Sequence, residues 1–201
     1  ILRQYRRYAD LAESYSAIPS RFLAITHGVS AVGKSHVAMR LVEALGAIRL
    51  RSDRERKRLF EAQQAATQDT LYAGLYSSEI SAATYAHLHR LAGDILAAGY
   101  PVFIDATYLQ HSQRQAAQAV AETLGCPLLI LDCHAPQAYI EQWLAQRQAD
   151  QQDPSDATLE VIAAQQSRRE PLLREEQLLC QRVDTHDASS LDSLIERIRQ
   201  H

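Results

Sequence analysis

The stretch "RFLAITHGVSAVGKSHVAMRLVEALG", residues 21–46, decides the fold that we expect for this chain. A short apolar run ends at Gly28, and Lys34 and Ser35 then complete the pattern G-x-x-x-x-G-K-S. Apolar residues with helical spacing follow as far as Gly46, a typical stop signal for a helix. Lys34 is one of two lysines beside 19 arginines, so a mere surface cation here would be expected to be arginine. Strand, glycine loop and helix in this order predict a phosphate-binding loop.

In such a loop, successive backbone N–H groups cradle phosphate oxygens, helped by the positive end of the following helix. Lys34 would reach the β- and γ-phosphates, and the hydroxyl of Ser35 would ligate Mg²⁺. The pattern G-x-G-x-x-G of dinucleotide sites is absent, because Val29 and Ser30 follow Gly28. The sequence therefore predicts a nucleoside triphosphate site that uses ATP and Mg²⁺. The residues expected to bind the nucleotide are Gly28, Val29, Ser30, Ala31, Val32, Gly33, Lys34, Ser35 and His36.

The composition fits one soluble α/β domain. The chain has 201 residues, of which 46% are hydrophobic, and a formal net charge of −3. This charge argues against a surface coated for duplex DNA. Three cysteines form no C-x-x-C pair, which disfavours a disulfide scaffold and favours the cytoplasm. Its apolar runs are shorter than the roughly 20 residues that a membrane-spanning helix needs, so we expect no membrane contact.

The first residues, "ILRQYRRYAD", contain neither an initiator Met nor the apolar core of a signal peptide. We therefore expect an excised or processed chain and a native protein in which another domain precedes it. Residues 1–18 would form a lead-in helix or linker, and residues 19–201 one phosphate-loop kinase domain.

Apolar runs that alternate with helical patterns set the fold class. Such an alternation predicts a mostly parallel sheet covered by helices on both faces, with ligands bound outside the carboxyl ends of the strands. Gly28, Asp53, Asp105 and Cys133 fall at or near these ends. The expected strands span 21–28, 47–53, 101–107, 126–135 and 178–185. The expected helices span 2–16, 34–46, 53–60, 77–99, about 110–124, 136–148, a stretch from 156 and 189–200, and polar breaks lie at 63–77 and 149–157.

Asp105 ends the apolar run "PVFID" and is the candidate partner of Ser35 at a metal site. A carboxylate that follows a buried strand beside a phosphate loop can hold a Mg²⁺-bound water. The alternative is that Asp105 caps the helix that follows it.

Asp53 is the candidate catalytic base. Phosphoryl transfer to a hydroxyl needs a carboxylate that orients the hydroxyl and accepts its proton. Asp53 could instead cap the helix "RERKRLF", and the two roles are compatible. Arginines alternate around it, and we expect at least one to face the cleft while most are solvated. These are Arg51, Arg54, Arg56 and Arg58.

Arg147 precedes the polar break "QADQQDPSDA", which is long enough to form a lid. Lids often bring a guanidinium to the transferred phosphoryl group. The alternative is an exposed arginine at a helix end, where cations are favoured. Arg114 is a weaker candidate for this role, and Arg168 and Arg169 are weaker still. His87 and His89 would point to different faces of their helix, so a shared metal is not expected.

Together these motifs resemble the P-loop kinase domains of an AAA-type ATP-binding family, related to polynucleotide 5′-hydroxyl kinase and zeta-toxin-like kinases. The resemblance covers about residues 21–178 and includes "GVSAVGKS", "IRLRSDRERKRLF", "FIDATYLQHSQR" and "DPSDATLEVIAAQ". It is greatest to the ATP-binding half of two-domain bacterial proteins whose first half resembles aminoglycoside phosphotransferases. Such relatives often carry an additional arginine near position 141 or 143, where this chain has Glu141 and Trp143.

The resemblance implies a P-loop NTPase three-layer sandwich with a small lid and five parallel strands in the order 2-3-1-4-5. It also implies that Asp53 is the general base, that Arg56 engages the acceptor and that Arg147 is the lid arginine. The expected function is ATP- and Mg²⁺-dependent transfer of the γ-phosphate to a hydroxyl of a small molecule or a nucleic-acid 5′ end. The alternative is a module that binds or hydrolyses ATP to regulate a preceding domain. The acceptor stays open, because this fold serves many substrates.

Overall fold

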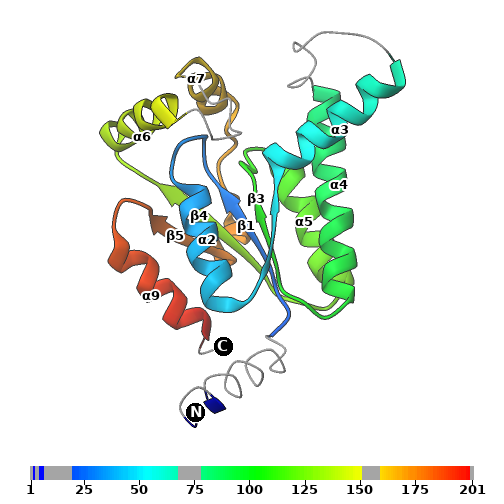
Figure 1. The fold of residues 1–201 in the computed structure, drawn as a ribbon, viewed down its shortest axis with the longest axis vertical. Coiled ribbons are helices and arrows are strands. Elements are labelled where there is room, and N and C mark those ends of the chain that lie inside the picture. The colour runs from blue at the N-terminus through cyan, green and yellow to red at the C-terminus, as the bar shows by residue number, and fades with distance from the viewer. Residues whose placement is uncertain (1, 3–4, 7–19, 68–77, 151–158, 200–201) are drawn as a thin grey trace.

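A computed structural model describes residues 2, 5–6, 20–67, 78–150 and 159–199, with side chains except at 62–67, 78, 146–150, 159, 188 and 199. Among these residues, five strands form one sheet in the order β2-β3-β1-β4-β5, and all neighbours are parallel (Figure 1). This confirms the expected fold class and strand order. The strands are β1 (Leu23–His27), β2 (Ile48–Arg51), β3 (Val102–Asp105), β4 (Leu128–His134) and β5 (Cys180–Asp184).

The sheet is covered on both faces, as the apolar runs of its central strands require. Every residue of β1 and β3 is buried. Helices α2 (Lys34–Leu45) and α9 (Ala188–Arg199) pack on one face, in a core with Ala24 and Phe103. Helices α4 (Ser78–Ala97) and α5 (His111–Thr123) pack on the other, in a core with Leu23 and Ile25. A strand buried on both faces is apolar at nearly every position rather than at alternate ones.

The remaining helices are α3 (Ser52–Thr67), α6 (Gln137–Asp150), α7 (Leu159–Arg168) and the short α8 (Arg174–Leu178). In Figure 1, α3, α6 and α7 rise above the edge of the sheet at which the strands end. Because all five strands are parallel, their carboxyl ends share this edge. Arg51 at the end of β2 lies in register with Asp105 at the end of β3. The fold thus gathers the residues after β1, β2 and β3 into one place.

Several expected boundaries were wrong. The strand expected at 47–53 ends at Arg51, and Asp53 belongs to the first turn of α3 instead. Helix α3 also continues through 63–67, where a polar break was expected, and α8 was not expected at all. The lead-in helix at 2–16, apart from three of its residues, lies outside the described residues, as do 68–77 and 151–158 of the two polar breaks.

None of the helices in the described part of the chain combines the length and the apolar character needed to cross a membrane.

Candidate active site

The loop between β1 and α2 has the geometry that the glycine pattern predicts. Gly33 has a φ of 85°, which is the left-handed region that favours glycine. A Cβ atom there would lie 2.9 Å from the side chain of Thr185 and 3.2 Å from the ring of Trp143. Thr185 in turn donates a hydrogen bond from Oγ1 to the carbonyl oxygen of Val32, at 2.7 Å. The β5–α9 loop therefore supports the phosphate loop from outside and leaves room only for glycine.

Lys34 begins α2 and folds back over this loop. Its side chain is 8% exposed, and its Nζ donates a hydrogen bond to the carbonyl oxygen of Val29 at 2.5 Å. The first N–H groups of a helix lack partners within that helix and carry partial positive charge. A buried ammonium beside the amino end of α2 makes this loop suited to a polyanion.

Ser35 and Asp105 meet one residue further along α2. The hydroxyl of Ser35 donates to Oδ2 of Asp105 at 2.9 Å, and Arg49 from β2 donates from Nη2 to the same oxygen. Asp105 is 6% exposed. It does not cap the following helix, because α5 begins at His111 and its N-cap is Gln110.

The donor set of Ser35 and Asp105 fits Mg²⁺. This ion prefers oxygen ligands and is usually held by one or two carboxylates together with substrate phosphates and water. Among the described residues, no group of three or more His, Cys, Asp or Glu side chains forms a complete protein cage for a metal. The pair therefore suits a metal ion that arrives with phosphate groups.

Asp53 lies at the start of α3 and is held by two neighbours. Arg51 donates to its two oxygens, from Nε at 3.1 Å and from Nη2, and the backbone N–H of Arg54 donates at 2.8 Å. Burial tends to raise the pKa of Asp53, but the hydrogen bonds and charge of Arg51 and the N–H of Arg54 outweigh it and lower this pKa below its ordinary value. Asp53 is therefore a carboxylate at neutral pH that lines the cavity, and because α3 begins at Ser52 it lies within the first turn of that helix rather than at the N-cap position.

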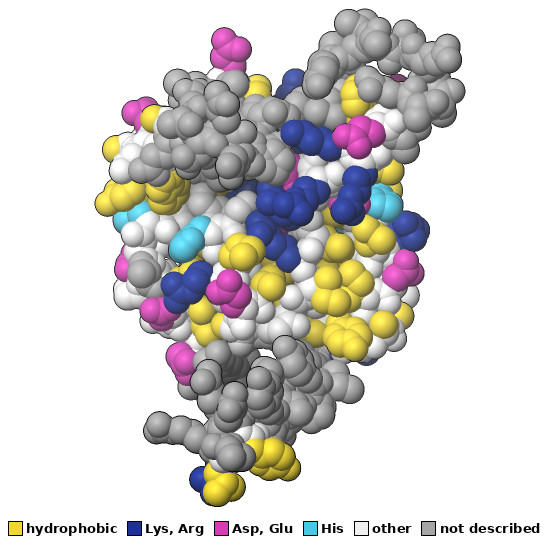
Figure 2. Space-filling view, in the orientation of Figure 1, with side chains coloured by type: hydrophobic (Ala, Val, Ile, Leu, Met, Phe, Trp, Pro, Cys, Tyr) yellow, Lys and Arg dark blue, Asp and Glu magenta, His cyan; other side chains and the backbone are white. Residues whose placement is uncertain are grey.

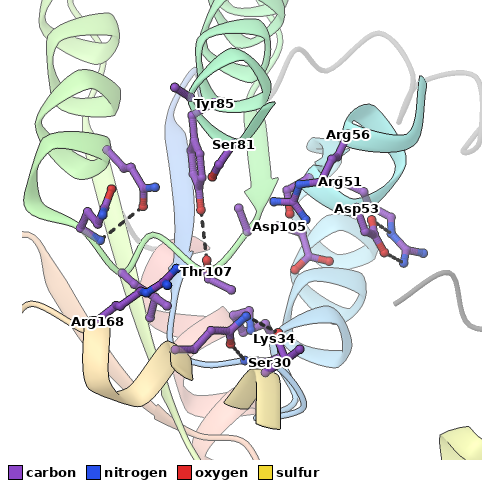
Figure 3. A pocket seen from close by; sticks show the side chains of 18 of the residues that line it. Ser30, Lys34, Arg51, Asp53, Arg56, Ser81, Tyr85, Asp105, Thr107 and Arg168 are labelled. Carbon is purple, nitrogen blue, oxygen red and sulfur yellow. Dashed lines mark hydrogen bonds and ion pairs between the residues drawn. The ribbon is translucent and has the colours of Figure 1, made fainter. Parts of the chain in front are cut away.

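These groups line one cavity of about 650 Å³, within the range of small-molecule sites. Figure 3 shows Ser30 and Lys34 on one side of it and Ser81 and Tyr85 from α4 on the opposite side. The hydroxyl of Tyr85 shares a hydrogen bond of 3.1 Å with that of Thr107. The α4 and α5 walls carry neutral polar side chains, and the candidate charged residues lie toward the loop and α3. Those charged residues are Lys34, Arg51, Asp53, Arg56 and Asp105.

Helix α7 covers the phosphate loop through Gln165. The backbone N–H of Ser30 donates to Oε1 of Gln165 at 2.7 Å, and Nε2 of Gln165 donates to Oγ of Ser30 at 3.0 Å. One turn further on, Arg168 lines the cavity. From the sequence, Arg168 was only a weak candidate for the arginine that approaches the transferred phosphoryl group. Its spacing of three from Gln165 nevertheless places both residues on one helix face.

A family model described as "AAA domain" matches residues 23–172. The chain belongs to the AAA domain family. Uncharacterized proteins of Mycobacterium tuberculosis (strain ATCC 25618 / H37Rv) and Mycobacterium bovis are each 28% identical to it over 148 residues, 73% of this chain and 29% of each relative. The chain thus spans less than a third of the length of these curated relatives.

Solved structures that include two kinases share the fold of this AAA domain. A sugar kinase from Janibacter sp. superposes with a TM-score of 0.63 at 18% identity, covering 90% of this chain and 94% of its own. The APS kinase of Mycobacterium tuberculosis, in complex with AMPPNP and APS, gives 0.58 at 17% identity over 90% and 97%. Chaetomium thermophilum Kti12, in complex with ADP-AlF3, gives 0.66 at 14% identity over 89% and 97%. The architecture is that of P-loop kinases.

The structure of the AAA domain does not bring every candidate residue to the cavity. Of the nine loop residues, Ser30, Ala31, Gly33, Lys34 and Ser35 line it, whereas Gly28, Val29, Val32 and His36 do not. Cys133 is buried beneath Gly28, and burial raises the pKa of its thiol to about 12, so it packs rather than reacts.

The other arginines of the AAA domain differ in position. Arg114 was a wrong candidate: it is fully buried and donates to both oxygens of Glu176. Arg169 pairs with Asp132 at 3.0 Å. The side chain of Arg147 and most of the expected lid lie outside the described residues. In Figure 2, basic side chains gather on one face over the region of β2 and α3.

The two histidines of α4 have different partners. His87 approaches Glu55 at 3.3 Å, and His89 approaches the hydroxyl of Tyr108 at 3.0 Å. Burial lowers the pKa of His89, which lines the cavity as a neutral group at neutral pH. The two imidazoles therefore do not form a metal site.

Proposed function

We propose that this domain is an ATP- and Mg²⁺-dependent phosphotransferase that moves the γ-phosphate to a hydroxyl. One observation carries the proposal: Lys34, the Ser35–Asp105 pair and Asp53 line the same cavity. A phosphate-binding cation, oxygen ligands for Mg²⁺ and an ionised carboxylate are the groups that this reaction needs.

The donor side of the cavity is built by α2 and its loop. Lys34 and the N–H groups at the start of α2 would hold the β- and γ-phosphates. Ser35 and Asp105 would hold Mg²⁺, which supplies positive charge to offset that of the phosphate oxygens. Arg168 from α7, which lines the cavity together with Thr107, would follow the transferred group (Figure 3).

Asp53 and Arg56 are the acceptor-side residues. As the acceptor oxygen bonds to the γ-phosphorus, the bond from that phosphorus to the β–γ bridging oxygen breaks, and ADP leaves. The hydroxyl proton passes to Asp53. Because the pKa of Asp53 is lowered, its principal contribution is to orient the hydroxyl, and the proton moves late. Arg56 would engage the acceptor or its phosphorylated product.

The acceptor is a small hydroxyl compound or a nucleic-acid 5′ end. The neutral polar walls offered by Ser81, Tyr85 and Thr107 favour a small hydroxyl-rich molecule, because such groups can exchange hydrogen bonds with several hydroxyls. The basic region over β2 and α3 favours a polyanion such as a nucleic-acid end.

The test is ADP formation with and without candidate acceptors: monosaccharides, polyols and 5′-hydroxyl oligonucleotides. We expect one class to raise ADP formation and to become labelled from γ-³²P-ATP. Lys34→Ala should abolish both signals, and Asp53→Asn should lower labelling by ~10²-fold or more while ATP still binds. Labelling that persists in the Lys34 variant would contradict the proposal.

A second candidate function is a module that binds or hydrolyses ATP to regulate a preceding domain in a longer protein. Two observations favour it: the match covers 29% of each curated relative, and Arg51 occupies both oxygens of Asp53. On this reading ATP is consumed at the same rate with every acceptor, and Asp53→Asn leaves that rate unchanged.

A further inference from the structure

An arginine outside the cavity lining contacts Asp105, one of the two residues proposed to bind the metal ion. Arg49 lies on β2, two residues before Arg51, and donates from Nη2 to Asp105 on β3. It is not among the residues that line the cavity, and its side chain is 12% exposed. Within the described structure, its Nε atom is buried and makes no hydrogen bond. The guanidinium is therefore directed at Asp105 rather than toward solvent or substrate.

Arg49 and Ser35 use the same oxygen of Asp105. Both donate a hydrogen bond to Oδ2, which leaves Oδ1 as the carboxylate oxygen for a metal ion. A carboxylate attracts a divalent cation through its negative charge, and a guanidinium in contact with it offsets that charge. The pair of Arg49 and Asp105 is close to neutral as a unit. It would attract a free divalent ion only weakly, unlike a carboxylate left to itself.

We propose that Arg49 suppresses the affinity of the Ser35–Asp105 site for free divalent cations, so that the site accepts Mg²⁺ only together with nucleotide phosphates. The proposal rests on the function given above and adds how the metal enters. Phosphate groups bound at Lys34 would supply negative charge in place of the Asp105 charge that Arg49 offsets. Metal and nucleotide then bind as one unit, and the nucleotide-free protein holds no resident divalent ion at this site.

The consequence for a variant follows from charge alone. In Arg49→Met the carboxylate of Asp105 loses its counter-charge but keeps the hydrogen bond from Ser35. The nucleotide-free protein should then bind Mn²⁺, a spectroscopic substitute for Mg²⁺, about tenfold more tightly, the scale that Coulomb's law gives for one charge within a few ångströms of a divalent ion. Arg49→Lys keeps the charge and should bind like the parent.

The experiment measures free Mn²⁺ by electron paramagnetic resonance during titration of the nucleotide-free protein. The parent, Arg49→Met, Arg49→Lys and the double variant Arg49→Met/Asp105→Asn are compared. A control, Arg40→Met, removes a surface arginine that pairs with the exposed Asp192 on α9. We expect tighter binding in Arg49→Met alone, and loss of that gain in the double variant.

Equal Mn²⁺ affinity of the parent and Arg49→Met would overturn the proposal, as would a gain that survives Asp105→Asn or that also appears in Arg40→Met. Circular dichroism checks folding, and Arg49→Gln replaces the Met variant if that variant does not fold. Binding of Mn²⁺–ATP is measured in the same way for the parent and for Lys34→Ala. This measurement separates the proposed function from the proposed role of Arg49. If Mn²⁺–ATP does not bind, the proposed function fails; if it binds and Arg49→Met changes nothing, only the role of Arg49 fails.

Discussion

Replacing Asp53 by Asn separates catalysis from a structural role at the start of α3. Asn keeps an oxygen that can accept from the backbone N–H of Arg54, as Oδ1 of Asp53 does at 2.8 Å. It cannot accept a proton, and it loses the charge that pairs with Arg51. The substitution therefore removes the chemistry and leaves most of the local structure.

The two effects should differ in size. The Asp53–Arg51 pair is partly exposed, at 24% and 20% for the two side chains, so losing its charge should cost about 1 kcal/mol of stability or less. Loss of a general base costs ~10²-fold or more in rate, which corresponds to about 2.7 kcal/mol of transition-state stabilisation. ATP affinity should hardly change, because the proposed function places Asp53 with the acceptor and not with the nucleotide.

The assay is transfer from γ-³²P-ATP to the acceptor identified above, with stability measured by urea unfolding on the same samples. Asp192→Asn, which removes a carboxylate from an exposed pair, is the matched control. An Asp53→Asn enzyme with parental transfer rate would refute the catalytic assignment and favour the regulatory module. A variant that loses several kcal/mol of stability would instead show that Asp53 is chiefly structural.

The pH dependence of the transfer rate follows from the direction in which the pKa of Asp53 is shifted. Because the pKa of Asp53 is lowered below 3.8, its carboxylate stays ionised at every pH above that value, and transfer should not fall between pH 8 and pH 5 through its protonation. Arg51→Met removes the hydrogen bonds that lower this pKa, so the acid limb of the rate profile should move to higher pH. An acid limb near pH 6 in the parent would show that another group controls the rate.

Three further predictions concern the rest of the chain. Burial raises the pKa of Glu176, but the hydrogen bonds from Arg114 lower it more, to about 2. The ionised Glu176 should therefore contribute roughly 3 kcal/mol of stability above pH 4.5, and this contribution should be lost as the pH falls toward 2. Glu176→Gln should therefore lose about 3 kcal/mol of stability in urea unfolding at pH 7, and its stability should decline less below pH 4.5. Glu175→Gln, which changes the exposed neighbour, should alter neither quantity. An unchanged urea midpoint for Glu176→Gln would contradict this prediction. If Arg168 acts on charge in the transition state, as we propose, Arg168→Ala should lower the turnover number in steady-state kinetics by about tenfold or more, with little change in ATP affinity. Gly33→Ala should lose ATP binding in calorimetry, since its Cβ would lie 2.9 Å from the β5–α9 loop at a φ of 85°.

The sequence was sufficient for the parts of the fold that rest on local patterns. The glycine loop ending in Lys34 lies between an apolar run and a helical one, and this order predicted β1, α2 and the parallel sheet around them. The end of β2 was wrong because the strand signal of "AIRLR" and the helix signal of Ser52 and Asp53 are adjacent. The helix α8 was missed because five residues are too few to show a period.

Contacts between distant residues could not be predicted in this way. Gln165 and Ser30 are 135 positions apart, and only the packing of α7 over the loop brings them together. Arg49 meets Asp105 because of the register between β2 and β3, whereas in the sequence it looks like one of many solvated arginines. The position of Arg168 in the cavity lining depends on the same packing of α7, and the burial of Arg114 could not be predicted because nothing local to it indicates Glu176 as its partner.

The phosphate site can be tested most directly with the chain's one tryptophan, Trp143, whose ring lies 3.2 Å from where a Cβ of Gly33 would be. Its fluorescence should change saturably as Mg²⁺–ATP is added, because phosphate groups bound at this loop would alter the surroundings of the ring. In Lys34→Ala the same titration should require at least about tenfold more ATP, since the variant lacks the cation that would pair with the phosphates. A Lys34→Ala protein that binds Mg²⁺–ATP as tightly as the parent would contradict the assignment of this cavity as a nucleoside triphosphate site.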